Sequence, residues 1–376
     1  MNSRLNQFFT RFFALLALAL ILPIITTSPA RAEPPVLLKH SRPELIEKWQ
    51  ARIQSFLDSG VIPIVDFLSF LPRKNGDSVV RRTNKLMDET GVALICLGGY
   101  EAEKEKGGKG YPWGYYIHEV VNEYPDRYVL STNKGGNKDW WGQKGGKPRN
   151  FIDQLEVHVR SGDYPFISQL EFRHYMSNAQ CKQGKTERDV DIPINGENGH
   201  RLFRLASDTG VPFSIHLEPE DHAIDALEEM LAEYPKAKVI WTHFGQIRHP
   251  ENEKRFGPKL VERLLSSNPN LYFDISTGEP NRRYQCGEGV LDTVIWQGST
   301  LAQKSELKPE YKSILSRFSD RFVAGLDYGP SNRQSADYFR RRVSNIRLIL
   351  RDLPDDARHN IGYRNGWYLL TGKSWE

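Results

Sequence analysis

Three short apolar runs in the second half of the chain each end on a polar side chain: PFSIHLEP (212–219) on His216, KVIWTHFG (238–245) on His243 and RFVAGLDYGP (321–330) on Asp327. Each run is rich in β-branched and aromatic residues and is bounded by turn residues, so each predicts a buried parallel strand. A (β/α)8 barrel carries its functional residues at the C-terminal ends of such strands. Two histidines and an aspartate at that end indicate a metal-dependent hydrolytic centre.

Strands and helices alternate along the rest of the chain. After a leading helix over 41–60, the sequence predicts strands at 62–67, 92–99, 127–132, 166–173, 212–216, 238–243, 271–276 and 321–327, with helices between them. Eight such units predict an α/β fold, a (β/α)8 TIM barrel with an N-terminal helix. An open doubly wound sheet would carry a glycine-rich phosphate fingerprint after its first strand, and DFLSFLP (66–72) contains none.

Two of the expected connections are long. They are EAEKEKGGKGYPWGYY (101–116) after strand two and NKGGNKDWWGQKGGKPRN (133–150) after strand three. Both follow C-terminal strand ends, so both are expected at the mouth of the barrel, where Trp140 could stack on a substrate. Solvated loops whose tryptophans pack down as anchors are the alternative.

The N-terminus has the pattern of an export signal. Arg4 and Arg11 precede or flank the apolar stretch 14–25, and Ala30-Arg31-Ala32 offers small residues for cleavage before Glu33. We therefore expect a signal peptide over 1–32, one mature domain over 33–376 and a periplasmic or secreted location. A membrane anchor is the alternative, but the apolar run is shorter than the roughly 20 residues that a bilayer span needs.

The charge of the chain argues against a nucleic-acid partner. The full chain has a formal charge of +4, and the expected signal peptide holds three arginines and no acidic residue, so the mature protein carries about +1. The expected partner is instead a small-molecule substrate, and a homo-oligomer is left open. Cys96 lies in an apolar run, whereas Cys181 and Cys286 lie in polar segments and could form a disulfide in an oxidising compartment.

The chain resembles the amidohydrolase superfamily, in its amidohydrolase-related branch of metal-dependent hydrolases and decarboxylases. The segments that carry the resemblance lie between Asp66 and about Leu370: HEVVNEYPDRYVLST (118–132), LFRLASDTGVPFSIH (202–216), EEMLAEYPKAKVIWTHFG (228–245), NLYFDIS (270–276), RFVAGLDYGP (321–330) and LPDDARHNIGYRNGWYLLTG (353–372). The resemblance implies that His216, His243 and Asp327 are the functional residues of strands five, six and eight.

Strand one departs from the family pattern. Where the family carries His-x-His after an aspartate, this chain has Leu68-Ser69-Phe70 after Asp66, and neither Leu68 nor Phe70 can bind a metal. By strict alternation, positions 66, 68 and 70 share one face of the strand and line the barrel. The metal position that depends on this pair is therefore expected to be lost.

A single metal position remains to be filled. As in some members of the superfamily, a strand-four carboxylate could join the two histidines, and Glu171 in LEFRHYM (170–176) points inward by alternation. Glu171, His216 and His243 with one water would make a tetrahedral site for one divalent ion, most simply Zn²⁺. An ion pair between Glu171 and Arg173 or a neighbouring helix is the competing interpretation.

Catalysis at such a site would divide between the ion and two side chains. The ion would activate water, Asp327 would act as general base, and the metal or His243 would polarise the carbonyl. Substrate contacts are assigned to Arg173, His174, Trp140 and Arg282, which lie near the expected mouth. The sequence favours an exported hydrolase of amide, ester or lactone bonds, or a related decarboxylase, with at most one metal. The alternative is a non-catalytic binding protein that has kept the barrel and lost the metal site.

Overall fold

The computed structural model of the chain describes residues 43–70, 76–99, 115–136, 151–176, 178–246, 253–277, 283–284, 290–291, 295–298, 305–329 and 335–376. All of them belong to one compact unit, which begins at Pro35. The long connections after strands two and three, with Trp140, lie largely outside the described residues, as do Arg282 and Cys286.

Eight parallel strands form the centre of this unit. One sheet has the order β1 (Ile64–Phe70), β2 (Val92–Gly98), β3 (Tyr128–Leu130), and the other contains, in spatial order, β13 (Phe322–Val323), β8 (Leu271–Asp274), β7 (Val239–Trp241), β6 (Phe213–Leu217) and β4 (Ile167–His174). Parallel bridges join the two sheets at both edges, between Ser131 and Phe166 on one side and between Asp66 and Ala324 on the other. The strands therefore close into a ring, which confirms the expected (β/α)8 barrel.

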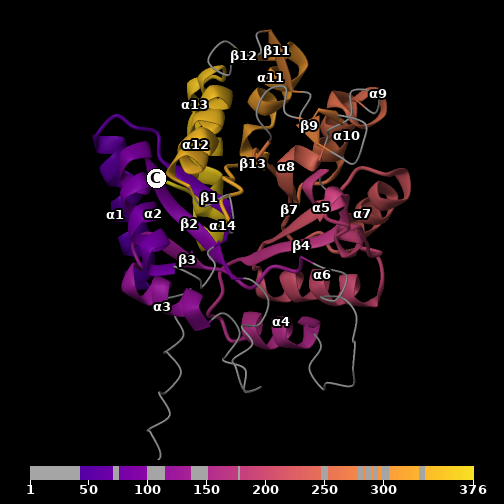
Figure 1. The fold of residues 1–376 in the computed structure, drawn as a ribbon, viewed down its shortest axis with the longest axis horizontal. Coiled ribbons are helices and arrows are strands. Elements are labelled where there is room, and N and C mark those ends of the chain that lie inside the picture. Colours follow the sequence, from indigo (N-terminus) through magenta and orange to yellow (C-terminus); the bar gives the residue numbers. More distant parts are fainter. Residues whose placement is uncertain are drawn as a thin grey trace, which may run out of the picture. The chain divides into compact units, whose positions relative to one another are not determined.

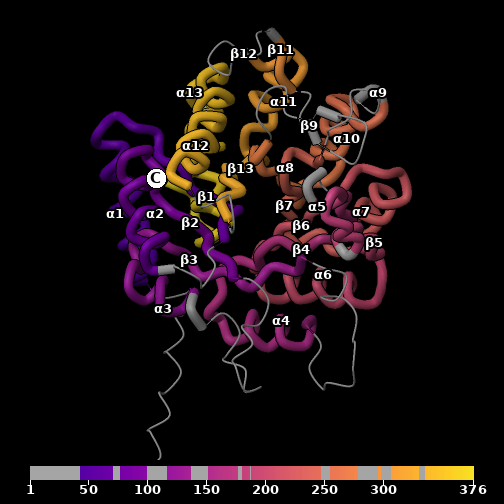
Figure 2. Tube along the Cα trace, in the orientation of Figure 1, coloured from indigo at the N-terminus to yellow at the C-terminus, as the bar shows by residue number. Residues whose placement is uncertain are grey.

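A helix follows each of the eight strands and packs outside the ring (Figure 1). These helices are α2 (Gly76–Thr90), α3 (Tyr115–Glu123), α4 (Phe151–Arg160), α6 (Glu197–Thr209), α7 (Asp221–Glu233), α10 (Pro258–Ser267), α11 (Pro309–Arg317) and α12 (Ala336–Arg351). The last helix, α12, packs on the first, α2. Strand β1 lies beside the C-terminal elements (Figure 2). The described helices include none that is long and apolar enough to cross a bilayer.

The interior of the barrel is apolar at one end and polar at the other. Near the N-terminal ends of the strands, inward side chains such as Val65, Phe67 and Ile240 form one cluster with α1 (Pro43–Asp58) and with α14 (Asn365–Thr371). The leading helix that the sequence predicts is therefore present. Because this cluster fills the N-terminal half of the interior, only the C-terminal strand ends are left for polar side chains.

The sequence did not reveal several shorter elements. After β4 the chain forms α5 (Asn178–Lys182), the 3-10 turn η2 (Thr186–Arg188) and β5 (Val190–Asp191), which pairs antiparallel with Arg173 and His174 of β4. We call residues 178–191 the strap. Two small hairpins follow β8: β9 (Arg283–Tyr284) with β10 (Val290–Leu291), and β11 (Trp296–Gly298) with β12 (Ser305–Leu307). The remaining described elements are α8 (Thr242–Gly245), α9 (Glu253–Phe256), the 3-10 turn η4 (Ser319–Arg321), α13 (Asp355–His359) and the π-helical turn η6 (Asn360–Arg364).

One expectation about local structure needs adjustment. The pairing of β1 with β2 shifts register between Asp66 and Ser69, so the strict alternation that would place 66, 68 and 70 on one face is interrupted. Cys96 is buried, as expected, and its thiol is free, whereas Cys181 takes part in a disulfide.

Candidate active site at the C-terminal end of the barrel

His216 and His243 come together at the C-terminal strand ends. His216 lies in β6 and is buried, and His243 follows β7 and is half-buried. Their ring centroids are 5.2 Å apart in an edge-to-face arrangement, and the ring of His174, at the end of β4, lies 4.6 Å from that of His216. The sequence therefore placed both histidines correctly, because adjacent parallel strands deliver their C-terminal residues to one place.

The backbone that carries His243 is left-handed. The sequence predicted a strand up to His243, but β7 ends at Trp241, and residues 243–246 all have positive φ, with values of 57° at His243, 53° at Phe244 and 56° at Gln246. Such a conformation costs about 1 to 2 kcal/mol for each non-glycine residue. Three of these four residues are not glycine, so the surrounding structure must hold the turn in place.

Asp274, the last residue of β8, provides that support. It is fully buried, and its Oδ1 accepts hydrogen bonds from His243 N (2.7 Å), Ser276 N (2.9 Å) and Ser276 Oγ (2.5 Å). Burial raises the pKa of Asp274, and the charge of His243 together with these hydrogen bonds opposes the rise. A Cβ at position 325 would lie 3.1 Å from Asp274 Oδ2, so glycine at 325 leaves room for the carboxylate.

The same network fixes the tautomer of His243. The ring nitrogen Nδ1 lies 3.0 Å from the carbonyl oxygen of Ser276 and 2.9 Å from Ser276 Oγ. Because a carbonyl oxygen only accepts, Nδ1 must carry the proton. The lone pair of His243 is therefore on Nε2, which faces the interior of the site.

His216 presents its lone pair from the other ring nitrogen. Amide Nε2 atoms of Gln246 and Gln169 lie 3.2 Å and 3.4 Å from His216 Nδ1, and an amide nitrogen can only donate. His216 Nε2, 3.4 Å from Glu218 Oε1, then carries the proton. His216 Nδ1 and His243 Nε2 are therefore the unprotonated nitrogens of the two imidazoles.

Gln169 Nε2 lies between these two lone pairs. It is 3.4 Å from His243 Nε2, as it is from His216 Nδ1, and it donates to Thr242 Oγ1 at 3.0 Å. Two imidazole lone pairs that point at one position can bind one cation there. His216 and His243 therefore fit as two of the ligands of a divalent metal. Within the described ranges, no group of three His, Cys, Asp or Glu side chains could hold an ion as the side chains now stand.

Glu171 faces the interior, as the sequence predicted, but it forms an ion pair with Arg188 of the strap. Its side chain is 2 % exposed, and Arg188 Nη2 donates to Glu171 Oε1 at 2.5 Å. Burial raises the pKa of Glu171, whereas the charges of Lys134, Arg188 and His243 lower it. Glu171 does not form the alternative ion pair with Arg173, because Arg173 forms ion pairs with Asp189 and Glu220.

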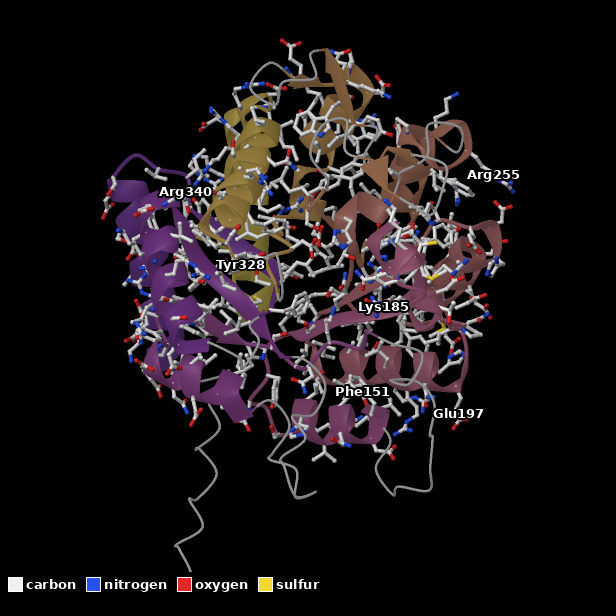
Figure 3. The ribbon with its side chains drawn as sticks, in the orientation of Figure 1. Phe151, Lys185, Glu197, Arg255, Tyr328 and Arg340 are labelled. Atoms are coloured by element: carbon white, nitrogen blue, oxygen red, sulfur yellow. The ribbon has the colours of Figure 1, made fainter. Side chains whose placement is uncertain are left out.

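The two described residues assigned to substrate contacts have structural partners. Arg173 sits between Asp189 (2.7 Å) and Glu220 (2.7 Å). His174 Nδ1 donates to the carbonyl oxygen of Arg188 at 2.7 Å, and its Nε2 lies 3.4 Å from Arg188 Nη2. His174 therefore holds the strap to the end of β4. The strap includes Lys185, which Figure 3 labels. The other two assignments, Trp140 and Arg282, lie outside the described residues.

Asp327 is at the C-terminal end of the β13 segment, beyond the two residues that pair as a strand. Its backbone is left-handed (φ 48°), its side chain is half-buried, and its carbonyl oxygen accepts a hydrogen bond from Tyr338 Oη at 3.2 Å. The next residue, Tyr328, is labelled in Figure 3, and its carbonyl oxygen accepts from Phe70 N at 2.8 Å. Asp327 is therefore fixed at the rim by its backbone.

Asp66 is a buried carboxylate beneath the rim. Its Oδ1 accepts from Leu68 N (2.9 Å) and from Leu326 N (2.7 Å), and its Oδ2 accepts from Ser69 Oγ. Burial raises the pKa of Asp66 from 3.8 to about 6, with a further contribution from the charge of Asp274, and the three hydrogen bonds limit the rise. The carboxylate thus ties β1 to the segment that leads to Asp327.

We predict that Asp66→Asn removes part of the pH dependence of stability. A carboxyl whose pKa is raised by folding stabilises the protein fully only below its unfolded pKa, and that stability is lost as the pH rises from about 4 to about 6. The rise of this pKa from 3.8 to about 6 corresponds to about 3 kcal/mol of stability. Asparagine can accept the hydrogen bonds of both backbone N–H groups and donate one to Ser69. Between pH 4 and pH 7 the free energy of unfolding of the variant should therefore fall by about 3 kcal/mol less than that of wild type.

Urea unfolding at several pH values measures this difference. The exposed Asp58→Asn on α1 is the control. Identical pH profiles for wild type and Asp66→Asn would contradict the assignment of this titration to Asp66.

Comparison with known proteins gives one family match, over the C-terminal half of the chain. Residues 182–365 match the Amidohydrolase family model. No curated protein matches the chain. Similar solved structures include an uncharacterized TIM-barrel protein from Bordetella bronchiseptica (13% identity, 83% of this chain and 100% of that one, TM-score 0.47) and 2,6-dihydroxybenzoate decarboxylase from Rhizobium (12%, 82% and 98%, 0.46). A third is amidohydrolase 2 from Bifidobacterium longum subsp. infantis (11%, 82% and 99%, 0.43).

At these identities and scores the solved structures add nothing to the barrel that the strand pairing establishes. The family match begins within the strap and runs through β6, β7, β8 and β13 to the C-terminal helices, so it covers the segments that deliver His216, His243 and Asp327. The chain is therefore a closed (β/α)8 barrel whose C-terminal half is similar to the Amidohydrolase family.

Proposed function

We propose that this protein is an exported hydrolase of an amide, ester or lactone bond, or a decarboxylase of the same type, that uses at most one divalent metal. The observation that carries the proposal is the convergence of His216 Nδ1 and His243 Nε2 on one point, each with its lone pair directed inward. Export is supported by the basic and apolar N-terminal segment with its small-residue site at 30–32.

The metal would be held by His216 and His243, with an oxygen ligand from the β4 side. Glu171 could provide that oxygen once it leaves Arg188, and the Gln169 amide could do so by turning its carbonyl oxygen inward. Imidazole nitrogen with carboxylate or amide oxygen suits Zn²⁺. Such an ion, when bound, lowers the pKa of a water and polarises a carbonyl.

The side chains of the chain then have separate tasks. Asp274 and Ser276 keep the Nδ1 proton of His243 in place, so that Nε2 always faces the reacting group. Asp327 stands at the rim as the general base that takes a proton from the attacking water and returns it to the leaving group. Arg188 holds the carboxylate of Glu171 and, through His174, closes the strap over one side of the site.

A non-catalytic binding protein is the second candidate. It is favoured by the Gln169 nitrogen between the two imidazoles and by the ion pair of Glu171 with Arg188, which together fill the place of an ion with the chain's own groups. The two candidates differ in whether a metal enters the site.

We expect purified wild-type protein to bind one zinc ion per chain. His216→Ala and His243→Ala should each weaken zinc binding by at least about 10- to 100-fold. Changing a residue that only hydrogen-bonds to a metal ligand already has an effect of this size, and each variant removes a ligand itself. Equilibrium dialysis followed by elemental analysis measures the affinity. His222→Ala, whose side chain is 66% exposed, is the control. Wild-type protein that takes up no zinc or manganese would reject the metal-dependent hydrolase and favour the binding protein.

We expect Asp327→Asn to lower turnover by roughly 10²- to 10⁴-fold, the usual contribution of general acid–base catalysis. Zinc content should stay unchanged, because the histidine ligands remain. Turnover is measured on those members of a panel of esters, lactones and anilides that the wild type hydrolyses. Equal turnover of wild type and variant at the same concentration of folded protein would remove Asp327 from the mechanism.

For export, we expect the mature protein in the periplasm or medium to begin at or near Glu33. N-terminal sequencing of the natural product tests this directly. Recovery of chains that still begin at Met1 from the membrane fraction, resistant to salt extraction, would instead identify the segment as an anchor.

A further inference from the structure

The last helix of the barrel, α12, carries three polar side chains that contact the ends of β8 and β13 (Figure 1). Tyr338, Arg342 and Asn345 are spaced by four and three residues, so they share one face of the helix, and all three are buried. Each of them donates a hydrogen bond to a backbone carbonyl oxygen of the segment that follows β8 or of the segment that follows β13. The helix therefore holds the rim of the barrel through its backbone.

Arg342 joins the two segments. It is 2 % exposed, and its guanidinium donates from Nε to Leu326 O (2.7 Å) and from Nη1 to Thr277 O (2.6 Å). No carboxylate among the described residues forms an ion pair with it, so a buried positive charge is used to hold two carbonyl oxygens. Burying a charge is costly. The planar guanidinium presents its donors in a fixed geometry, which suits two acceptors that must be held together.

The peptide groups on both sides of Asp327 are held by α12. The carbonyl oxygen of Leu326 belongs to the peptide group that precedes Asp327, and it accepts from Arg342 Nε. The carbonyl oxygen of Asp327 belongs to the peptide group that follows, and it accepts from Tyr338 Oη at 3.2 Å. The orientations of these two planar groups define φ and ψ of the residue between them. Two side chains one helical turn apart therefore support the left-handed backbone of Asp327, whose φ is 48°.

We propose that Arg342 is a positioning residue, which holds the backbone of Asp327 in the left-handed conformation and so fixes the direction in which the carboxylate leaves the chain. The inference rests on the proposed function, because it takes Asp327 as the general base. A left-handed conformation is unfavourable for a residue with a Cβ and persists only where the surroundings impose it. Without the bond from Arg342, the peptide group before Asp327 can rotate and φ can return to negative values. The carboxylate then leaves the position that proton transfer requires.

Turnover of the substrates that wild type hydrolyses tests whether Arg342 acts through Asp327. Arg342→Met removes both donors and keeps much of the side-chain length, so kcat should fall roughly 10- to 100-fold with KM unchanged, the effect of a misplaced catalytic group. In an Asp327→Asn background the same substitution should change kcat by less than about threefold, because residues that act as a unit are not additive. Zinc affinity should stay unchanged, since Asp274 still holds His243.

Arg347→Met is the matched control. Arg347 lies on the same helix and also donates to backbone carbonyl oxygens, those of Ile62 (2.6 Å) and Thr90 (3.1 Å). These two residues precede β1 and β2, at the opposite end of the barrel from Asp327. The control should lower stability and leave kcat per folded chain unchanged. The inference is overturned if Arg342→Met keeps the wild-type kcat, if its loss is as large in the Asp327→Asn background, or if the control loses as much.

Urea unfolding tests the same inference without a substrate. Glycine adopts positive φ without a steric cost, so Asp327→Gly relieves strain where the backbone is held and relieves none where it has relaxed. The substitution should therefore favour the folded state about fivefold more in the wild-type background than in Arg342→Met. Its effect should be the same in wild type and in Arg347→Met, because distant sites are additive. Additive effects of Asp327→Gly and Arg342→Met would overturn the inference.

Arg342→Lys covers the case in which Arg342→Met does not fold. It keeps the charge and most of the length but lacks the planar pair of donors, so kcat should still fall at least about tenfold. A wild-type kcat in Arg342→Lys would overturn the inference. If wild type hydrolyses no member of the panel, the hydrolase alone is refuted, and the unfolding measurements decide the role of Arg342. A hydrolase whose kcat does not respond to Arg342 refutes only the positioning role.

Discussion

The arrangement of the site depends on one buried carboxylate, that of Asp274. Its hydrogen bond to His243 N supports a turn of four left-handed residues, and its bond to Ser276 Oγ fixes the proton on the same histidine. The turn also brings Gln246 to His216. Asp274, on a strand that contributes none of the proposed ligands, therefore supports His243 directly and His216 through Gln246. Backbone strain of this kind persists only where the surroundings compensate for it.

Much of the architecture could be predicted from the sequence because the barrel has a simple pattern. Strands of β-branched and aromatic residues alternate with amphipathic helices, and the period of two places Glu171 on the inner face of β4. The same rule would have placed Gln169 there too, two residues earlier, so the residue between the imidazoles was within reach of sequence reasoning. His216 and His243 meet because their strands are neighbours.

Other features had no local signal. The left-handed turn is made by His243, Phe244 and Gln246, residue types that do not favour positive φ, and only the fully buried Asp274 of another strand explains it. Arg188 reaches Glu171 from the strap, whose return along β4 depends on tertiary contacts. The shift of register in β1 likewise follows from pairing with β2 and from the bond of Asp66 to Leu326 N. In each case a distant partner decides the conformation.

The Gln169 amide has a consequence for how any cation would enter. Its nitrogen faces both imidazole lone pairs and donates to Thr242 Oγ1, so the two imidazoles already have a hydrogen-bonding partner where an ion would bind. Entry is an exchange, in which the amide must rotate away or present its oxygen as the ion arrives. The free energy of cation binding would then be that of coordination less that of the amide contacts that are lost.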